Sequence, residues 1–385
     1  MARLVTVLHL IEGLGTGGSE QHLAHLVLHS DRSRFRHHVC GLGTAGRFVQ
    51  VLEAAGIPVY TLGYLAQRDF LRPLRPLRRL VQRVRPDVLH ACLYRPGVLA
   101  RLIGRWSGLP VVTTLVNTAY EPEWRLDDPR LSPLKVFLAR TLDAATARWR
   151  GAWFVAVSET VRDSAVRQLG IPAGRVRVIR RPLLLSPNGQ RPSAPAVRAA
   201  LGLPDADPLL LNVGRLVPQK GQQYAVRAMP RILASRPGAH LVIVGEGPLR
   251  PSLAALAEAL GVADHVTLLG ERHDVPDLLA AADCFLFPSL SEGAANALME
   301  ALAAGTPVVA SDIPSLRELT DDGRVAALVP LRAPEALAEA VLGLLADDAR
   351  RRRLCDAGKA WVRRWGDGDA VRAWEEFVAR IVEGA

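Results

Sequence analysis

Two series of short apolar segments, each alternating with helix-like stretches, constrain the fold of this chain more than any other feature. The first series predicts strands at residues 4–11, 38–42, 59–62, 88–90, 111–115, 153–157 and 176–179. The second series predicts strands at residues 209–213, 241–244, 266–268, 284–288, 308–310 and 326–329. Strands that alternate with helices form parallel sheets with helices packed on their faces. The sequence therefore predicts two doubly wound α/β domains.

A polar stretch rich in proline separates the two series. Residues 186–195 are Ser-Pro-Asn-Gly-Gln-Arg-Pro-Ser-Ala-Pro, which is typical of a linker. At 385 residues the chain is also too long for one ordinary core. We predict a first domain at 1–185, a linker at 186–204, a second domain at 205–365 and a final amphipathic helix within 366–385.

Cysteine usage and hydropathy indicate the cellular compartment. No apolar run reaches the ~18 residues of a membrane-spanning helix, and the chain begins with a predicted strand instead of a signal peptide. Cys40, Cys92, Cys284 and Cys355 form no CxxC pair, which argues against a disulfide framework and against a zinc ribbon. These features predict a reduced, cytoplasmic protein.

Positive charge is concentrated in the first half of the chain. Residues 1–190 hold 27 Lys and Arg against 13 Asp and Glu, a balance of +14, whereas residues 191–385 hold 21 against 25, a balance of −4. A basic half favours an anionic partner, such as a lipid headgroup or a phosphorylated acceptor. We expect no nucleic acid partner, because no aromatic residues alternate with the charges and no binding motif is present.

Seven arginines between Arg68 and Arg85 recur through a segment that also has a regular apolar side. A helix with one cationic and one apolar face can lie on an anionic membrane surface. A domain helix that packs its apolar side on the sheet gives the same pattern, and Pro73 and Pro76 weaken the prediction of any helix. Peripheral association with the inner face of the membrane therefore stays open beside the packed-helix alternative.

A loop near residue 290 carries carboxylates that are candidates for ligand binding. Residues 284–288 predict a buried strand, and residues 296–304 predict a helix that ends at Gly305. Glu292 then lies in the loop, and Glu300 lies about one turn into the helix. A buried carboxylate is costly without a partner, and a helix N-terminus can bind phosphate. The two glutamates are either solvated charges beside a core helix or part of a site for hydroxyls and phosphates.

Cations follow the first strand of the second series. Arg215 and Lys220 lie in a glycine-containing loop directly after the predicted strand at 209–213. Two fixed cations can stabilise the charge on a leaving diphosphate without a metal, and they can equally be solvated side chains.

Glycines follow the first strand of the chain. Residues 13–18 (Gly-Leu-Gly-Thr-Gly-Gly) fit the dinucleotide fingerprint. Binding of NAD also needs an acidic residue at the end of the second strand, and residues 35–41 contain none. The loop is therefore better explained as glycines that let the backbone approach a diphosphate.

Taken together, these motifs resemble those of one enzyme family. The segment from Ser291 to Pro307 resembles the paired-glutamate signature of retaining GT-B glycosyltransferases, the group 1 or family 4 enzymes. The Gly-Arg-Leu triplet and the Lys-Gly pair within 214–221 resemble a second motif of the family, and the Gly-Gly-Ser-Glu turn at 17–20 resembles a third. The resemblance implies two Rossmann-like domains facing a cleft, with an N-terminal acceptor domain, a C-terminal nucleotide-sugar domain and a last helix that crosses back to the first domain.

The resemblance also implies a role for each motif residue. Glu292 would hold hydroxyls of the transferred sugar, and Glu300 would hold those of the ribose. Arg215 and Lys220 would steady the leaving diphosphate. The predicted catalytic residues are Glu292, Arg215, Lys220 and Asn117. The predicted donor-binding residues are Gly17, Gly18, Gly214, Arg215, Lys220, Gly245, Arg272, Glu292, Gly293, Ala294, Ala295, Asn296, Ala297 and Glu300.

Three places depart from the family pattern, and one of them is Pro314-Ser315, which replaces the usual Gly-Gly before Glu318. Asn117 stands where the family often has a histidine, and an amide can bind a sugar hydroxyl or phosphate but does not titrate near neutral pH. Residues 180–182 (Arg-Arg-Pro) replace the usual Asn-Gly. The added positive charge suits a phosphorylated acceptor, or it faces solvent.

Metal-binding patterns are weak. Asp-x-Asp occurs at 205–207 and at 367–369, but neither place has the sequence context of a metal-dependent sugar transferase. We therefore expect no metal and no other cofactor.

The sequence thus predicts a retaining, metal-independent glycosyltransferase. It would move a sugar from a nucleoside-diphosphate sugar to a hydroxyl acceptor, which is a glycan, a small molecule or an anionic or lipid-linked compound. Two alternatives stay open: an epimerase or phosphorylase of the same fold, and a non-catalytic partner subunit that binds a sugar nucleotide.

Overall fold

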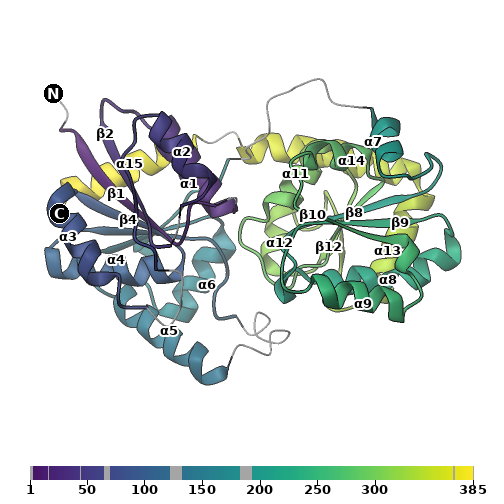
Figure 1. Cartoon of the computed structure of the whole chain (residues 1–385), viewed down its shortest axis with the longest axis horizontal. Coiled ribbons are helices and arrows are strands. Elements are labelled where there is room, and N and C mark those ends of the chain that lie inside the picture. The colour runs from purple at the N-terminus through teal and green to yellow at the C-terminus, as the bar shows by residue number, and fades with distance from the viewer. Residues whose placement is uncertain are drawn as a thin grey trace. The chain divides into compact units, whose positions relative to one another are not determined.

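The chain folds into two compact α/β units. The structure, a computed structural model, describes residues 3–15, 17–43, 45–64, 70–121, 132–182, 193–366 and 369–384. The N-terminal unit comprises residues 1–121, 131–181 and 368–385, and the C-terminal unit comprises 122–130 and 182–367. Each unit is built on one parallel sheet with helices packed against it (Figure 1). The predicted fold class is confirmed.

The N-terminal unit contains a seven-stranded sheet in the order β3-β2-β1-β4-β5-β6-β7, in which all neighbours are parallel. Its strands are β1 (Val5–Ile11), β2 (Phe35–Gly41), β3 (Val59–Thr61), β4 (Val88–Cys92), β5 (Val111–Leu115), β6 (Ala152–Ala156) and β7 (Val176–Val178). Its helices are α1 (Gly18–His29), α2 (Arg47–Ala54), α3 (Leu74–Val84), α4 (Tyr94–Ser107), α5 (Pro133–Ala147), α6 (Glu159–Leu169), the 3₁₀ turn η3 (Ala173–Arg175) and α15 (Ala370–Glu383).

The C-terminal unit contains a six-stranded parallel sheet in the order β10-β9-β8-β11-β12-β13. Its strands are β8 (Leu209–Val213), β9 (His240–Val244), β10 (Val266–Gly270), β11 (Cys284–Phe287), β12 (Val308–Ser311) and β13 (Ala327–Val329). Its α-helices are α7 (Ala194–Ala200), α8 (Gln222–Ser235), α9 (Arg250–Ala259), α10 (Val275–Ala281), α11 (Asn296–Ala304), α12 (Pro314–Leu319), α13 (Pro334–Ala346) and α14 (Asp348–Gly366). Two 3₁₀ turns, η4 (Pro218–Lys220) and η5 (Ala263–His265), complete it.

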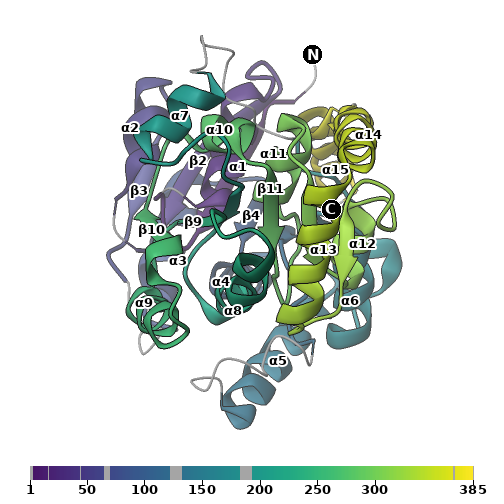
Figure 2. The same cartoon turned by 90° about the vertical axis from the view of Figure 1, so that its right-hand side faces the viewer.

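Two apolar cores lie on opposite faces of the six-stranded sheet. Helices α8, α9 and α13 pack on one face, and α7, α10, α11, α12 and α14 contribute to the core on the other (Figure 2). A sheet that is covered on both faces requires strands that are apolar throughout. This requirement explains why all four residues of β11 are buried.

The topology places three predicted motifs at the edges where ligands bind in parallel sheets. The strand order reverses between β1 and β4 in one sheet and between β8 and β11 in the other. Ligands bind outside the carboxyl ends of the strands at such a switch point. The Gly17 loop follows β1, the Arg215 loop follows β8 and the Glu292 loop follows β11.

Helix α7 occupies part of the range predicted as the linker. Ser193 caps this helix by accepting a hydrogen bond from the backbone N–H of Ala196. Val197 is buried in the core of the C-terminal unit. The structure therefore begins the C-terminal unit before residue 205, and residues 186–192 of the predicted linker lie outside the described residues.

Helix α3 packs the apolar side of the basic segment into the N-terminal core. Its buried residues are Leu77, Leu80 and Val81. Pro73 is the N-cap and Pro76 lies in the first turn, where a missing N–H breaks no helical hydrogen bond. The helix therefore forms despite both prolines, and its arginines are exposed to water. Arg68, the first arginine of the basic segment, lies outside the described residues.

Three histidines on adjacent strands form a buried hydrogen-bonded chain. Nδ1 of His9 lies 2.8 Å from Nδ1 of His90, and Nε2 of His9 lies 2.8 Å from Nδ1 of His37. The ring of Trp374, from α15, stacks on His9 with the centroids 5.8 Å apart. Burial lowers the pKa of His9 well below its usual value, that of His37 to about 4 and that of His90 to about 3. All three rings are therefore neutral at pH 7.

Helix α15 is anchored to the N-terminal unit by apolar residues and by one buried carboxylate. The apolar residues are Trp374, Phe377, Val378 and Ile381. Oε1 of Glu375 accepts hydrogen bonds from Ser30 Oγ at 2.6 Å and from the backbone N–H of Asp31 at 2.7 Å. Glu375 is only 5% exposed. The Ser30 hydroxyl and the Asp31 N–H therefore depend on its carboxylate, and not on water, as their hydrogen-bond acceptor.

We expect Glu375→Ala to lower the free energy of unfolding by about 3 kcal/mol, because the Ser30 hydroxyl stays buried without its acceptor. The neighbouring Glu376 is the matched control, since it forms an exposed ion pair with Arg372 at 3.1 Å and its loss should cost at most about 1 kcal/mol. Urea unfolding measures both values. Equal losses in the two variants would contradict the anchoring role.

Candidate functional site

Hydrogen bonds join the loops that follow β8 and β11. Nε2 of Gln219 donates to the Ser291 carbonyl at 2.6 Å, and the N–H of Leu290 donates to the Gln219 carbonyl at 2.8 Å. Gly221 has φ +64, and a Cβ at this position would collide with the carbonyl of Pro288. Only glycine permits this close approach without strain. The approach brings η4 against the end of β11 and sets the position of Lys220.

Lys220 and Glu292 form a direct ion pair between these loops. The distance from Lys220 Nζ to Glu292 Oε1 is 2.6 Å. Nζ also lies 5.6 Å from the ring centroid of Phe287, which is a cation–π distance. Glu292 is 5% exposed, and a carboxylate this deeply buried needs a cationic partner. The structure thus brings together two of the predicted catalytic residues.

Helix α11 begins directly after this loop without a side-chain cap. Its N-cap residue, Ala295, has φ +37 and makes no capping hydrogen bond. The first N–H groups of an uncapped helix carry partial positive charge and can bind an anion. The predicted donor-binding stretch 293–297 therefore comprises the end of the loop and the first two residues of α11, and it begins directly after Glu292 of the Lys220–Glu292 pair.

Glu300 is partly buried on α11 and makes no hydrogen bond or ion pair with the residues that the structure describes. Burial raises its pKa. An ionised carboxylate in such a place is only partly hydrated and has no partner among the described residues. A ligand that donates hydrogen bonds would supply the missing partner.

The Arg215 loop runs alongside the turn that follows β9. The N–H of Gly214 donates to the Val244 carbonyl, and the N–H of Leu216 donates to the Glu246 carbonyl, both at 2.9 Å. Gly245 has φ +133, and a Cβ there would collide with the carbonyl of Gly214. The Arg215 side chain is exposed, with no hydrogen bond or ion pair to described residues. Its guanidinium is therefore available to an anion.

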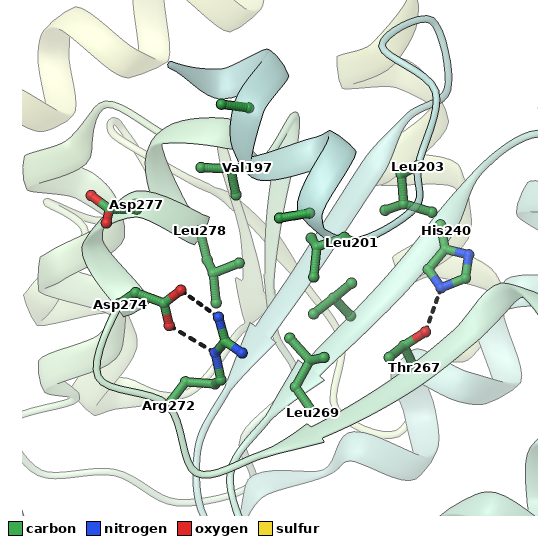
Figure 3. A pocket seen from close by; sticks show the side chains of 13 residues that line it. Val197, Leu201, Leu203, His240, Thr267, Leu269, Arg272, Asp274, Asp277 and Leu278 are labelled. Atoms are coloured by element: carbon green, nitrogen blue, oxygen red, sulfur yellow. Dashed lines mark hydrogen bonds and ion pairs between the residues drawn. The ribbon is translucent and has the colours of Figure 1, made fainter. Parts of the chain in front are cut away.

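Arg272 lies at the rim of a pocket of about 310 Å³ that is lined by residues of α7, β9, β10 and α10 (Figure 3). Its guanidinium donates two hydrogen bonds to the Asp274 carboxylate, at 2.8 and 2.5 Å. These bonds lower the pKa of Asp274. The pair with Asp274 fixes the orientation of the Arg272 side chain at the rim of the pocket.

The remaining predicted residues lie in the N-terminal unit. Gly17 is the N-cap of α1 and Gly18 is its first residue. Asn117 is partly buried in the loop after β5. Arg181 interacts electrostatically with Glu20 in the first turn of α1. The charge of Arg181 is therefore opposed by a carboxylate at the same edge of the sheet.

Two residues that support these loops were not predicted. Gln219 joins the loops of Lys220 and Glu292, and Tyr120 anchors the loop of Asn117 by donating to Asp143 Oδ2 at 3.0 Å. Tyr120 has φ +70, an unusual backbone for a residue with a large side chain. Their partners lie 72 and 23 residues away in the chain. No local pattern could have identified them.

The described ranges hold neither a metal-binding cluster nor a membrane-spanning helix. No three His, Cys, Asp or Glu side chains there are grouped so that they could hold a metal ion. Residues 367 and 368 of one Asp-x-Asp pattern lie outside those ranges. None of the helices described is both long and apolar enough to span a bilayer. All four cysteines are free thiols.

Two α/β units, each built on a parallel sheet with a switch point, are the architecture of the GT-B fold. The family model for glycosyl transferases group 1 matches residues 193–361, and the model for glycosyltransferase family 4 matches residues 16–183. A D-inositol 3-phosphate glycosyltransferase from Xylanimonas cellulosilytica is 33% identical over 312 residues, which cover 77% of this chain and 72% of that protein. The chain belongs to this glycosyltransferase family and is a glycosyltransferase.

Two further similarities add detail. A GDP-mannose-dependent alpha-(1-6)-phosphatidylinositol monomannoside mannosyltransferase from Mycobacterium tuberculosis is 35% identical over 185 residues, which cover 46% of each chain. The crystal structure of Anabaena HepE in complex with UDP-glucose superposes with a TM-score of 0.80 at 20% identity, covering 99% of this chain and all of that one. At this identity the structural likeness supports the GT-B fold alone.

Proposed function

We propose that this enzyme transfers a sugar from a nucleoside-diphosphate sugar to a hydroxyl acceptor, with retention of the anomeric configuration and without a metal. The Lys220–Glu292 pair at the start of α11 supports this proposal most strongly. It sets a cation for phosphate and a carboxylate for sugar hydroxyls beside the N-terminus of α11, where Ala295 provides no side-chain cap. A nucleotide sugar carries these same two kinds of group next to each other.

The proposed chemistry follows from the charge that develops as the glycosidic bond breaks. Negative charge builds up on the leaving diphosphate, where the Arg215 fork and the Lys220 ammonium stabilise it. Glu292 accepts hydrogen bonds from hydroxyls of the sugar and does not act as a nucleophile. The acceptor oxygen attacks the anomeric carbon from the side of the leaving group, and an oxygen of the diphosphate takes its proton.

The proposed acceptor is anionic or lipid-linked. The positive balance of residues 1–190, +14, favours a negatively charged acceptor in the N-terminal unit. Two relatives are named for such acceptors, one an inositol phosphate and the other a phosphatidylinositol mannoside. Asn117, which is partly buried at the carboxyl edge of this unit, is proposed to bind an acceptor or sugar hydroxyl.

Analysis of the product tests the reaction class. We expect proton NMR of the product to show the anomeric configuration of the donor, and we expect full activity in excess EDTA. An inverted product would contradict retention, and activity lost to EDTA and restored by a divalent ion would contradict metal independence. Sugar isomerisation without an acceptor would indicate an epimerase. Donor binding without turnover on any acceptor would indicate a non-catalytic subunit.

Donor affinity is expected to fall as the pH is lowered from 7 to 5. Burial raises the pKa of Glu300, so protonation begins above the usual value of about 4.3 and removes the charge that holds the ribose hydroxyls. Glu300→Gln should bind donor about tenfold more weakly at pH 7, because a hydrogen bond to a charged group is worth about 1.5 kcal/mol, and should lose this pH dependence. Calorimetric titration at pH 5, 6 and 7 measures both. An unchanged pH dependence in the variant would refute the role of Glu300.

A further inference from the structure

The histidine chain of His37, His9 and His90 continues to a hydroxyl near the carboxyl edge of the N-terminal sheet. Nε2 of His90 lies 2.8 Å from the hydroxyl oxygen of Thr114. His9 lies directly beside His90, whereas the β1 partner of His37 lies two positions before His9. Thr114 lies two positions beyond the β5 partner of His90. The chain therefore climbs across four strands and ends at Thr114, one residue before the end of β5.

Neutral imidazoles give such a chain a direction, because each ring carries one N–H donor and one bare nitrogen that accepts. All three rings are neutral at pH 7. Both nitrogens of His9 and of His90 are engaged, so every hydrogen bond in the chain runs the same way. In one direction, the Thr114 hydroxyl donates to His90 and the chain ends in an N–H at Nε2 of His37. In the other direction, Nδ1 of His37 donates first and Nε2 of His90 donates to Thr114.

The surroundings of His37 favour the direction that runs toward Thr114. Nε2 of His37 and Nε1 of Trp374 are both buried, and neither has a hydrogen-bond partner in the described part of the chain. Their rings are neighbours, with the centroids 6.5 Å apart. If the chain ran toward His37, both nitrogens would carry a hydrogen, and two buried donors cannot satisfy each other. If it runs toward Thr114, Nε2 of His37 is an acceptor next to the Trp374 donor.

This direction leaves the hydroxyl hydrogen of Thr114 for a group outside the chain. The oxygen accepts from His90, so the hydrogen must be donated elsewhere. The Cys92 sulfur is close, beside Thr114 in the strand register and 3.9 Å from Nε2 of His90. Burial raises the pKa of this thiol to about 11, so the sulfur is neutral and a weak acceptor. Because Thr114 is partly exposed, an oxygen of a ligand is the stronger acceptor available to it.

A cation acts at the same end of the chain. Arg181 interacts electrostatically with His90 and with Cys92. Glu20 opposes part of its charge, but Arg181 makes no hydrogen bond or ion pair with the residues that the structure describes. A guanidinium and a hydroxyl donor beside the same strand end are the groups that bind an anionic oxygen, such as one of a phosphate.

We infer that the histidine chain directs the Thr114 hydroxyl as a hydrogen-bond donor to an anionic oxygen of the acceptor. Thr114 is then a binding residue, and His37, His9 and His90 are positioning residues that act through it. The assignment of this oxygen to the acceptor rests on the proposed function, because Asn117 and the proposed acceptor edge lie three residues further on. The direction of the chain and the binding of an anion do not depend on turnover.

Nitrogen-15 NMR of the imidazole rings in the full chain tests the direction. We expect His37 and His9 to carry their hydrogen on Nδ1 and His90 to carry it on Nε2 at pH 7.5. Variants that each lack one of the three rings assign the signals. The reversed pattern, with hydrogen on Nε2 of His37 and His9 and on Nδ1 of His90, would overturn the inference.

Titration with inorganic phosphate tests the ligand. We expect phosphate to shift the Nε2 signal of His90 in the wild type, and we expect Thr114→Val to bind phosphate about tenfold more weakly, the effect of one hydrogen bond to a charged group. Thr114→Ser keeps the hydroxyl and should bind like the wild type. The matched control is Thr113→Val, on the opposite face of β5, where the hydroxyl accepts from Arg101 at 3.2 Å. This control should keep wild-type affinity for phosphate.

A His90 signal that phosphate leaves unchanged overturns the inference, and so does wild-type phosphate affinity in Thr114→Val. Titration with UDP-, GDP- and ADP-sugars separates the two sources of an anionic oxygen. We expect Thr114→Val to bind these donors like the wild type, whereas weaker donor binding would assign the oxygen to the donor diphosphate and overturn its assignment to the acceptor. None of these measurements requires glycosyl transfer, so they stay distinct from the test of the proposed function.

Discussion

Replacing Lys220 with Met is expected to lower turnover by about 100- to 1000-fold, which is the usual cost of losing one fixed group that stabilises developing negative charge. The same change should lower the free energy of unfolding by about 3 kcal/mol, because it leaves the buried Glu292 carboxylate without a cation. Steady-state kinetics and urea unfolding measure the two effects. Their sizes alone do not separate catalysis from stability, since both effects come from one ion pair.

The double variant Lys220→Met with Glu292→Gln separates them. It removes the unpaired buried charge, so we expect stability to return to within about 1 kcal/mol of the wild type, while turnover stays low. The control is Arg231→Met, which breaks an ion pair with Glu339 in which both side chains are about 60% exposed. Such a pair contributes little, so this variant should keep wild-type turnover and stability. Wild-type turnover in Lys220→Met would refute the assigned role.

Acid is expected to destabilise the protein steeply below pH 6.5, because the chain of His9, His37 and His90 must stay neutral in the folded state. Their pKa values are lowered by burial, so between pH 6.5 and about 4 the unfolded chain binds protons that the folded chain does not. Stability then rises with pH, and it falls as the pH drops through this window. The slope approaches about 1.4 kcal/mol per pH unit for each histidine.

A variant with leucine at all three histidine positions tests this expectation. Leucine removes the titrating groups and keeps the positions apolar, so the slope between pH 6.5 and 5 should fall by several kcal/mol per pH unit, in line with three groups at about 1.4 each. Urea unfolding at pH 7.5, 6.5, 5.75 and 5 gives the slopes. The wild type and the variant share all other titrating groups, so the difference between their slopes reports the three histidines. Equal slopes would show that the histidine chain does not control acid stability.

Local pattern was enough to predict most of the elements. The strands at 111–115 and 209–213 and the helix at 296–304 are reproduced residue for residue by β5, β8 and α11. Each is an apolar run or a periodic segment closed by a stop signal such as Gly305. Strand β2 begins three residues before the prediction because Arg36 and His37 interrupt the apolar pattern. Tertiary pairing with β1 extends the strand over these polar residues.

Contacts between distant segments could not be predicted in the same way. Glu292 and Lys220 were each identified by family motif, but their ion pair joins residues 72 apart and depends on the pairing of β8 with β11. The histidine chain depends likewise on the order β2-β1-β4. In the sequence these histidines look like isolated polar residues in apolar strands. The roles of the site residues stay predictions that rest on chemistry and resemblance.

Calorimetric titration of UDP-, GDP- and ADP-sugars into the wild type and into the Lys220→Met, Glu292→Gln double variant tests the central claim most directly. A donor site that contains the Lys220–Glu292 pair predicts that the wild type binds nucleotide sugars with one of these three nucleotides. It also predicts that the double variant, folded and about as stable, binds the same donor at least about 100-fold more weakly, a loss of about 2.7 kcal/mol. Equal affinity in the two proteins would place the donor elsewhere and contradict the claim.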